Sequence, residues 1–287
     1  MEWLGAQARK RQEVGGMRVI GRVGVLIVAL LAALGIPGLG TPGLGTFGLG
    51  TGTALAGPAT PVRPQIVGGA LTATAQHPWM VALATVASNS AYCGGALIAP
   101  DRVMTAAHCI RGYRLGNVRV IGGRTDLRGN DGEQRGVRGF WLHPGYRSPV
   151  QGADVAVLFL DRALPYRTLP LETDPSAYRP GAAATVLGWG YTSEGGPNSS
   201  TLRSADVDLI AESDCAATYR QFDSNEMLCA GRPRGGADAC YGDSGGPLVV
   251  GDRLIGVTSW GSGCGRADRP GVYTRVASYA AEINAQL

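Results

Sequence analysis

From residue 66 to the end of the chain, short apolar runs alternate with turns rich in Gly, Pro, Asn and Asp. Such runs, bounded by turn residues, are typical of strands in an all-β sandwich or barrel. The clearest ones are Trp79–Ala84, Gly95–Ile98, Val118–Ile121, Val155–Leu160, Ala184–Leu187, Leu248–Val250 and Leu254–Ser259. This region is long enough for two small β-barrels. The stretch Leu164–Pro180, rich in Pro and polar residues, predicts the connection between them.

Two stretches predict helices. One is Glu212–Tyr219. The other is the C-terminus, where Ser278 is expected to cap a helix and apolar residues recur at helical spacing, at Val276, Tyr279, Ile283 and Leu287.

The first 65 residues follow a different pattern. A basic stretch ends at Arg22, and the uncharged apolar run Val23–Ile36 follows it. A membrane-spanning helix needs about 20 apolar residues, so this shorter run is typical of the apolar region of a secretory signal, and Ala54-Leu55-Ala56 supplies a small-residue cleavage site. We therefore expect a signal peptide at 1–56, a short propeptide at 57–65 and a secreted domain at 66–287.

Two alternatives stay open for this leader. It could remain as a membrane anchor with a Gly-rich stalk, and Met17 could replace Met1 as the first residue. In every case the domain from Ile66 onward lies outside the cytoplasm.

The charge of the chain changes which partners we expect. The net charge of +4 and the pI of about 8.8 suggest nucleic acid or an anionic membrane as a partner. However, residues 1–65 contain all of the basic excess, whereas residues 66–287 contain 20 basic and 20 acidic side chains. The exported domain therefore has no general attraction to nucleic acid.

All six cysteines follow the leader, and no C-x-x-C pair suggests a metal or redox site. This usage indicates three disulfides formed in an oxidising compartment, while the spacing alone leaves the pairing open. The cysteines are Cys93, Cys109, Cys215, Cys229, Cys240 and Cys264.

The chain has three histidines. His77 and His143 both precede a proline and are expected to be turn residues. His108 ends an apolar segment beside Cys109, so it is held rigidly and is a candidate general base. The three are too far apart in the sequence to suggest a zinc site, and we expect no metal and no cofactor. Calcium binding by the loop Gly122–Glu133, through Asp126 and Asp131, is left open.

The strongest chemical signal is Ser244, which lies in Gly242-Asp243-Ser244-Gly245-Gly246. The glycines let the backbone turn sharply, expose the hydroxyl and direct amide N–H groups toward one point, where they can stabilise an oxyanion. The segment also matches the nucleophile elbow of α/β-hydrolases, but that fold places its histidine after the serine. No histidine follows His143, so a lipase or esterase is excluded.

An acid between the histidine and the serine would complete a triad. Asp154 precedes the apolar strand and, alone, would be read as a turn residue at the strand's entry. Together with His108 and Ser244 it becomes the buried acceptor that orients the histidine.

At this point the sequence resembles the trypsin-like (chymotrypsin-fold) serine endopeptidases. The resemblance covers residues 66–287 and rests on six motifs in the right order: Ile66-Val67-Gly68-Gly69, Thr105-Ala106-Ala107-His108-Cys109, Asp154-Val155-Ala156, Gly242-Asp243-Ser244-Gly245-Gly246-Pro247, Ser259-Trp260-Gly261 and Pro270-Gly271-Val272-Tyr273.

The resemblance implies two six-stranded antiparallel β-barrels with the active site between them, and a C-terminal helix. It implies Ser244 as nucleophile, His108 as base and acid, Asp154 as the orienting acid, and an oxyanion hole formed by the N–H groups of Gly242 and Ser244. It also implies the disulfides Cys93–Cys109, Cys215–Cys229 and Cys240–Cys264.

The same resemblance places Asp238 at the base of a specificity pocket, whose walls at Gly261 and Gly271 lack side chains and so leave it open. It also implies that Ser259-Trp260-Gly261 binds the substrate backbone as an added strand. A carboxylate there predicts cleavage after Arg or Lys. Ala239 lacks the hydroxyl that many relatives have, which favours the bidentate guanidinium of Arg over the compact ammonium of Lys.

The resemblance further implies a zymogen, in which the freed α-amino group of Ile66 pairs with Asp243. The preceding residue is Gln65, not Arg or Lys, so we expect a different protease to activate the precursor. Other expected partners are protein or peptide substrates and protein protease inhibitors, and the enzyme is expected to be a monomer. A non-catalytic relative that serves as a binding module is the alternative, but such proteins usually lose a triad residue.

Overall fold

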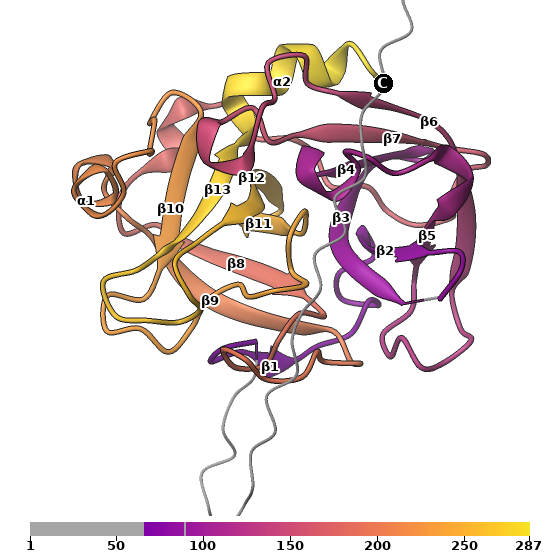
Figure 1. The fold of residues 1–287 in the computed structure, drawn as a ribbon, viewed down its shortest axis with the longest axis horizontal. Coiled ribbons are helices and arrows are strands. Elements are labelled where there is room, and N and C mark those ends of the chain that lie inside the picture. Colours follow the sequence, from indigo (N-terminus) through magenta and orange to yellow (C-terminus); the bar gives the residue numbers. More distant parts are fainter. Residues whose placement is uncertain (1–65, 89) are drawn as a thin grey trace, which may run out of the picture. The chain divides into compact units, whose positions relative to one another are not determined.

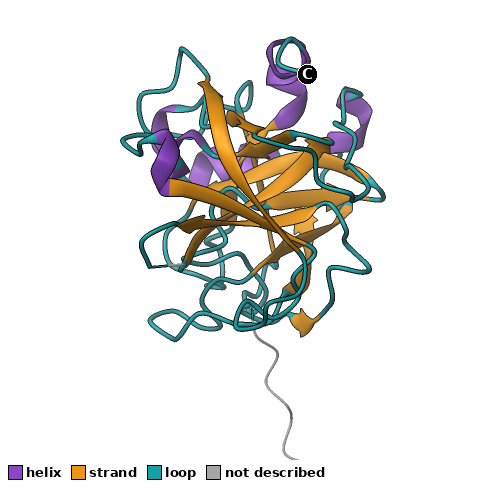
Figure 2. Ribbon diagram, turned by 90° about the vertical axis from the view of Figure 1, so that its right-hand side faces the viewer, coloured by secondary structure: helices purple, strands orange, loops and turns teal. Residues whose placement is uncertain are grey.

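The computed structural model describes residues 66–88 and 90–287. Within this region nearly all regular structure is strand, and loops and a few short helices connect the strands (Figure 2). The strands form two closed antiparallel barrels, which Figure 1 shows on the right (β2 to β7) and on the left (β8 to β13). The expected all-β fold is therefore confirmed.

The first barrel has the strand order β2-β3-β4-β7-β6-β5. Its buried positions are almost entirely Val, Leu, Ile, Met and Ala, residues that pack well between pleated surfaces. The strands are β2 (Met80–Thr85), β3 (Ala91–Ala99), β4 (Arg102–Thr105), β5 (Val118–Gly122), β6 (Glu133–Leu142) and β7 (Ala156–Leu160).

The second barrel has the order β9-β10-β13-β12-β11-β8 and closes through the pairing of β8 with β9. The short strand β1 (Ala70–Leu71) adds to β9 from outside. The six strands are β8 (Ala183–Gly188), β9 (Arg203–Leu209), β10 (Met227–Gly231), β11 (Pro247–Val250), β12 (Arg253–Trp260) and β13 (Gly271–Arg275). The chain passes from one barrel to the other through residues 161–182, as the sequence predicted.

The two α-helices lie where the sequence predicted them, at α1 (Glu212–Thr218) and α2 (Val276–Asn284). The expected cap by Ser278 is wrong. The residue before α2 is Arg275, and Ser278 lies inside the helix, where its hydroxyl donates to the Asn225 carbonyl. The prediction failed because the helix begins two residues before Ser278, which is therefore the third residue of the helix and does not precede it.

Helix α2 follows the last strand of the second barrel and packs against both barrels. Its buried residues Val276, Tyr279 and Ile283 belong to one apolar cluster, which contains residues of β2 to β7 and also of β8, β11 and β12. In Figure 1 the helix crosses above both barrels. The end of the chain therefore ties the two barrels together.

The three disulfides have the pairing that the family resemblance implied: Cys93–Cys109, Cys215–Cys229 and Cys240–Cys264. The first joins β3 to the one-turn helix η1 (Ala107–Cys109), which contains His108. The third joins two segments that line the same pocket.

No helix in residues 66–88 and 90–287 is long and apolar enough to cross a membrane. The expected signal peptide, its cleavage site and the propeptide fall at residues 1–65, outside the described residues.

Candidate active site

Asp154 lies just before β7 and is only 1% exposed. Its Oδ1 accepts a hydrogen bond from the backbone N–H of His108 at 2.9 Å, and its Oδ2 is 2.7 Å from Nδ1 of the same residue. Because an ionised carboxylate only accepts hydrogen bonds, Nδ1 must carry the proton, which leaves the lone pair of the neutral ring on Nε2. The geometry therefore sets the tautomer that a general base needs.

The second barrel also holds Asp154. The hydroxyl of Ser259, on β12, donates to Oδ2 at 2.5 Å, and the hydroxyl of Thr274, on β13, donates to the Asp154 carbonyl at 2.8 Å. Three donors thus reach the buried carboxylate, which is how proteins make such a group tolerable, and a fourth holds the backbone of the same residue.

His108 follows β4 in the turn η1. Its neighbours Ala107 and Cys109 are buried, and the disulfide to Cys93 fixes the turn against β3. The His108 side chain is 24% exposed, so part of the ring remains accessible from outside.

Backbone contacts place the Ser244 turn beside the strand and turn that position His108. The N–H of Gly94, next to Cys93, donates to the Ser244 carbonyl at 2.8 Å. A Cβ on Gly245 would lie 2.2 Å from the Thr105 Oγ1 and 2.6 Å from the Gly94 carbonyl oxygen, and φ at Gly245 is +77°. Only glycine allows this approach.

In the described part of the chain, no hydrogen bond joins Ser244 Oγ to the His108 ring, whose Nε2 lies 3.7 Å from Cys109 Sγ. Such bonds are often long without substrate and shorten when it binds. The structure therefore brings the three sequence-predicted triad residues into one region and forms the bond between Asp154 and His108.

Two backbone N–H groups near Ser244 are free. Those of Gly242 and Ser244 itself donate to no group within residues 66–88 and 90–287. The turn between them is fixed, because the Asp243 N–H donates to the Cys240 carbonyl and the Gly246 N–H to the Asp243 carbonyl. Two fixed, unsatisfied donors, one on the serine itself and one two residues before it, form a site that can bind an oxyanion.

Asp243 is completely buried. Its Oδ1 accepts from the Gly190 N–H at 2.7 Å and its Oδ2 from the Cys240 N–H at 2.9 Å. Burial raises the pKa of this carboxyl to about 7, against the smaller lowering effect of these two bonds. No ion-pair partner of Asp243 is found among the residues the structure describes.

Ile66, the first described residue, is also fully buried and packs in the apolar cluster of the second barrel, with Val186, Ala205 and Tyr273 among its members. Its neighbour Gly68 passes so close to Gly236 that a Cβ would lie 1.9 Å from the Gly236 carbonyl oxygen.

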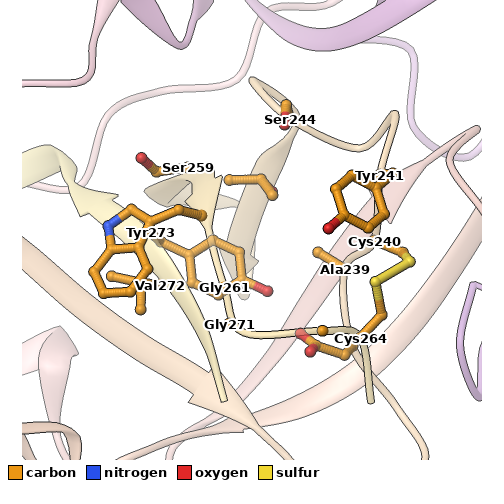
Figure 3. A pocket seen from close by; sticks show the side chains of 14 residues that line it. Ala239, Cys240, Tyr241, Ser244, Ser259, Gly261, Cys264, Gly271, Val272 and Tyr273 are labelled. Atoms are coloured by element: carbon orange, nitrogen blue, oxygen red, sulfur yellow. A yellow bond between two sulfur atoms is a disulfide. The ribbon is translucent and has the colours of Figure 1, made fainter. Parts of the chain in front are cut away.

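A cavity of about 210 Å³ opens beside Ser244 in the second barrel. In Figure 3, Ser244 lies at one end of this pocket and Cys264 at the other, with Tyr241 and Ser259 on opposite sides. The lining includes every substrate-binding residue predicted from the sequence: Asp238, Ala239, Ser259, Trp260, Gly261 and Gly271.

Asp238 is the acidic residue of this pocket and is 2% exposed. Its Oδ2 accepts from the Gly265 N–H at 3.0 Å, whereas its Oδ1 is buried and has no partner in the described structure. Burial raises the pKa of this carboxyl to about 7. A Cβ on Gly271 would lie 2.7 Å from that Oδ1, so glycine keeps the approach to it open.

The wall of the pocket at Ser259–Gly261 has a free strand edge. One edge of β12 pairs with β11 as far as Val257, and Thr258 continues it with hydrogen bonds to Gly245 and Gly246, while the other edge pairs with β13 up to Trp260. Beyond Thr258 the first edge has no backbone partner in the described structure, and such an edge can add an extended peptide as a further strand.

The other two histidines have structural surroundings. The ring of His77 packs edge-on against Trp79, and burial lowers its pKa. The Nδ1 of His143 accepts from the Gly145 N–H, and its ring contacts Trp141 and Tyr279.

The loop Gly122–Glu133 contains guanidinium groups rather than a cluster of carboxylates. The buried Arg124 donates to the Asp131 carbonyl at 2.7 Å, and Asp126 pairs with Arg128, whose hydrogen bonds lower the pKa of that carboxyl to about 2. Within the described residues, one group has the spacing of metal ligands, Cys93, His108 and Cys109, and its two sulfurs form a disulfide.

Sequence reasoning missed two donors to Asp154. It named Ser259 only for substrate binding, and it did not name Thr274. Both lie more than 100 positions from Asp154 along the chain, so no local pattern could have revealed their contact with it.

Comparison with known proteins agrees with this geometry. The family model described as Trypsin matches residues 66–283. The chain is 46% identical to a protein named Trypsin from Saccharopolyspora erythraea, over 75% of this chain and 94% of that protein. It is 39% identical to Trypsin zeta of Drosophila erecta, over 74% of this chain and 82% of that protein. It is 36% identical to the Vitellin-degrading protease of Bombyx mori, over 79% of this chain and 88% of that protein.

The raised pKa of Asp238 predicts how the pocket binds a small cation such as benzamidine. We expect the carboxyl to be ionised and to pair with the amidinium above about pH 7, and to be protonated below that pH. The Kd should therefore rise about tenfold for each pH unit below 7 and stay flat above it, as measured by calorimetry. Asp238→Ser should bind weakly at every pH, and a wild-type Kd that is constant from pH 5.5 to 8 would contradict the assignment.

Proposed function

The chain belongs to the trypsin family of serine-type endopeptidases, and from this premise we propose that it cleaves protein and peptide substrates after Arg, and less well after Lys, through the triad Ser244, His108 and Asp154. The observation that carries the proposal is the buried Asp154 carboxylate, which orients His108 beside a pocket lined by Ser244 and Asp238.

In acylation, the Ser244 Oγ attacks the carbonyl carbon of the scissile bond while its proton passes to Nε2 of His108. The Nδ1–H remains bonded to Asp154, which stabilises the positive charge that the ring acquires. When the tetrahedral intermediate collapses, the C–N bond breaks and the proton on Nε2 moves to the leaving amine. Water then repeats the sequence on the acyl-enzyme and regenerates Ser244.

The N–H groups of Gly242 and Ser244 stabilise the oxyanion in both steps. They are fixed before substrate arrives, so no reorganisation is needed as the charge develops. Loss of one such donor typically costs about 3 kcal/mol of transition-state stabilisation.

The preference for Arg follows from the unpartnered Oδ1 of Asp238. A guanidinium presents parallel N–H donors that match the two oxygens of a carboxylate. A lysine ammonium is more compact and depends on additional hydroxyl or water acceptors, and Ala239 offers no hydroxyl.

Paired peptide substrates that differ only in Arg or Lys before the scissile bond test this preference. Hydrogen bonds to charged groups contribute about 1.5–3 kcal/mol, so kcat/KM should favour Arg by about tenfold or more. Ala239→Ser should narrow the ratio by improving cleavage after Lys. Equal kcat/KM values for the wild-type enzyme on the two substrates would refute the proposal.

Activation is proposed to depend on Asp243 and Ile66. A fully buried carboxyl held by only two backbone N–H groups lacks a countercharge, and the free α-amino group created by cleavage at Gln65-Ile66 would supply it. Removing one partner of a buried ion pair costs about 3–5 kcal/mol, enough to hold the precursor inactive.

The pH dependence of the mature enzyme tests this ion pair. A free α-amino group has a pKa of about 7.7–8.0, and pairing with Asp243 raises it, so the stabilisation is present at neutral pH and is lost as the pH rises through the raised pKa. Activity on an Arg substrate should therefore fall at strongly alkaline pH and return on neutralisation. A flat profile to pH 11 would contradict the pairing.

The remaining proposals concern the route by which the enzyme reaches its substrate. It is secreted as a monomeric zymogen, with a signal peptide at 1–56 and a propeptide at 57–65. A separate protease cuts after Gln65, and protein protease inhibitors bind the mature site. A Ser244→Ala precursor expressed in the native host should still reach the medium with Ile66 as its N-terminus, whereas an uncut precursor would indicate self-processing.

A further inference from the structure

The residue before Asp154 has a strained backbone. Ala153 has φ of +51°, and in the described chain only Asp268 is another non-glycine residue with positive φ. An L-residue with a Cβ disfavours this conformation, which persists only where its surroundings impose it. Ala153 is buried, so the constraint comes from protein contacts.

One contact to this residue comes from the C-terminal helix. The hydroxyl of Tyr279, on α2, accepts a hydrogen bond from the Ala153 N–H at 2.9 Å. Tyr279 is 5% exposed, and its ring packs edge-on against His143, with centroids 4.9 Å apart. The hydroxyl therefore has little freedom to move away.

The charged and titratable groups near Tyr279 keep it protonated. Burial and then the carboxylates of Glu226 and Asp223 raise the pKa of the phenol, and His143 is the third titratable group that faces it. The hydroxyl thus remains neutral and available to accept from the Ala153 N–H throughout the working pH range.

The segment just after α2 also contacts the strand that leads to His108. The Arg102 Nε, on β4, donates to the Gln286 carbonyl just beyond the helix at 2.8 Å, and β4 leads directly into the turn that carries His108. The buried face of α2 packs in an apolar cluster that contains residues of this barrel and of the second barrel.

We propose that Tyr279 is a positioning residue for the reaction, whose hydroxyl holds the Ala153–Asp154 turn so that the Asp154 carboxylate meets Nδ1 of His108. This inference rests on the proposed role of Asp154. Without the hydroxyl, the Ala153 backbone relaxes toward negative φ and moves the carboxylate. The pocket that binds the substrate side chain contains none of these residues, so the defect falls on the chemical step.

The test is Tyr279→Phe, which keeps the ring against His143 and removes only the hydroxyl. We expect kcat per titrated active site to fall about tenfold, which equals about 1.4 kcal/mol, with KM changed less than twofold. The matched control is Tyr178→Phe. Tyr178 also accepts from a backbone N–H of α2, at Ala277, and donates to the Ile255 carbonyl, but it does not touch the Asp154 turn.

Rescue distinguishes positioning from a general loss of packing. Glycine adopts positive φ without steric cost, so in the Ala153→Gly background the turn no longer needs the hydroxyl. Relative to Ala153→Gly alone, Tyr279→Phe should then lower kcat less than threefold.

Three results would overturn the inference: equal kcat losses in Tyr279→Phe and Tyr178→Phe, a lower melting temperature of Tyr279→Phe with unchanged kcat per active site, or an undiminished loss of kcat in the Ala153→Gly background.

The variant Asp154→Ala distinguishes failure of this inference from failure of the proposed triad. If Asp154→Ala remains active, the triad is wrong, whereas if it is inactive and Tyr279→Phe behaves like the control, only the role of Tyr279 is wrong.

Discussion

The buried carboxylate of Asp154 is the interaction on which the site depends. It enters from the first barrel, accepts two hydrogen bonds from His108, and receives a third from Ser259 of the second barrel. An ionised group so deeply buried is tolerated only when donors surround it. The need to satisfy this charge therefore fixes the two barrels to each other at the point where the proposed chemistry takes place.

Two further buried carboxyls, which lie close together in the sequence, differ from Asp154 because they lack partners that offset their charge. Asp238 and Asp243 both have pKa values raised by burial to about 7, and neither has a cationic partner in the described structure. Asp154 has its partners within the fold. In the proposed function, the substrate side chain and the enzyme's own new N-terminus supply the two missing cations. The segment from Asp238 to Ser244 would then contain the residue that sets specificity, the residue that responds to activation and the nucleophile. Substrate specificity and activation would therefore both act next to Ser244.

The sequence predicted the class of fold and many of the core strands. Short uninterrupted apolar runs such as Val155–Leu160, bounded by turn residues, are typical of buried strands. It did not identify β6 or β9, where Arg, Gly and Asp alternate with apolar residues at partly buried positions. The Ser278 cap was wrong because the helix already begins at Val276, which places Ser278 inside its first turn. Motifs and the family resemblance brought the triad candidates together. The contacts of Ser259, Thr274 and Tyr279 with the Asp154 turn join segments over 100 residues apart, so only the folded chain reveals them.

The rate at which an organophosphate labels Ser244 in Asp154→Asn tests the central claim most directly. Asparagine keeps the size of the side chain, but its amide can donate to Nδ1 and so favours the wrong tautomer of His108. We expect a labelling rate lower by about 10⁴-fold, equal to the loss of kcat that such a change causes in a serine protease triad, with an unchanged melting profile. A folded variant labelled within tenfold of the wild-type rate would contradict it.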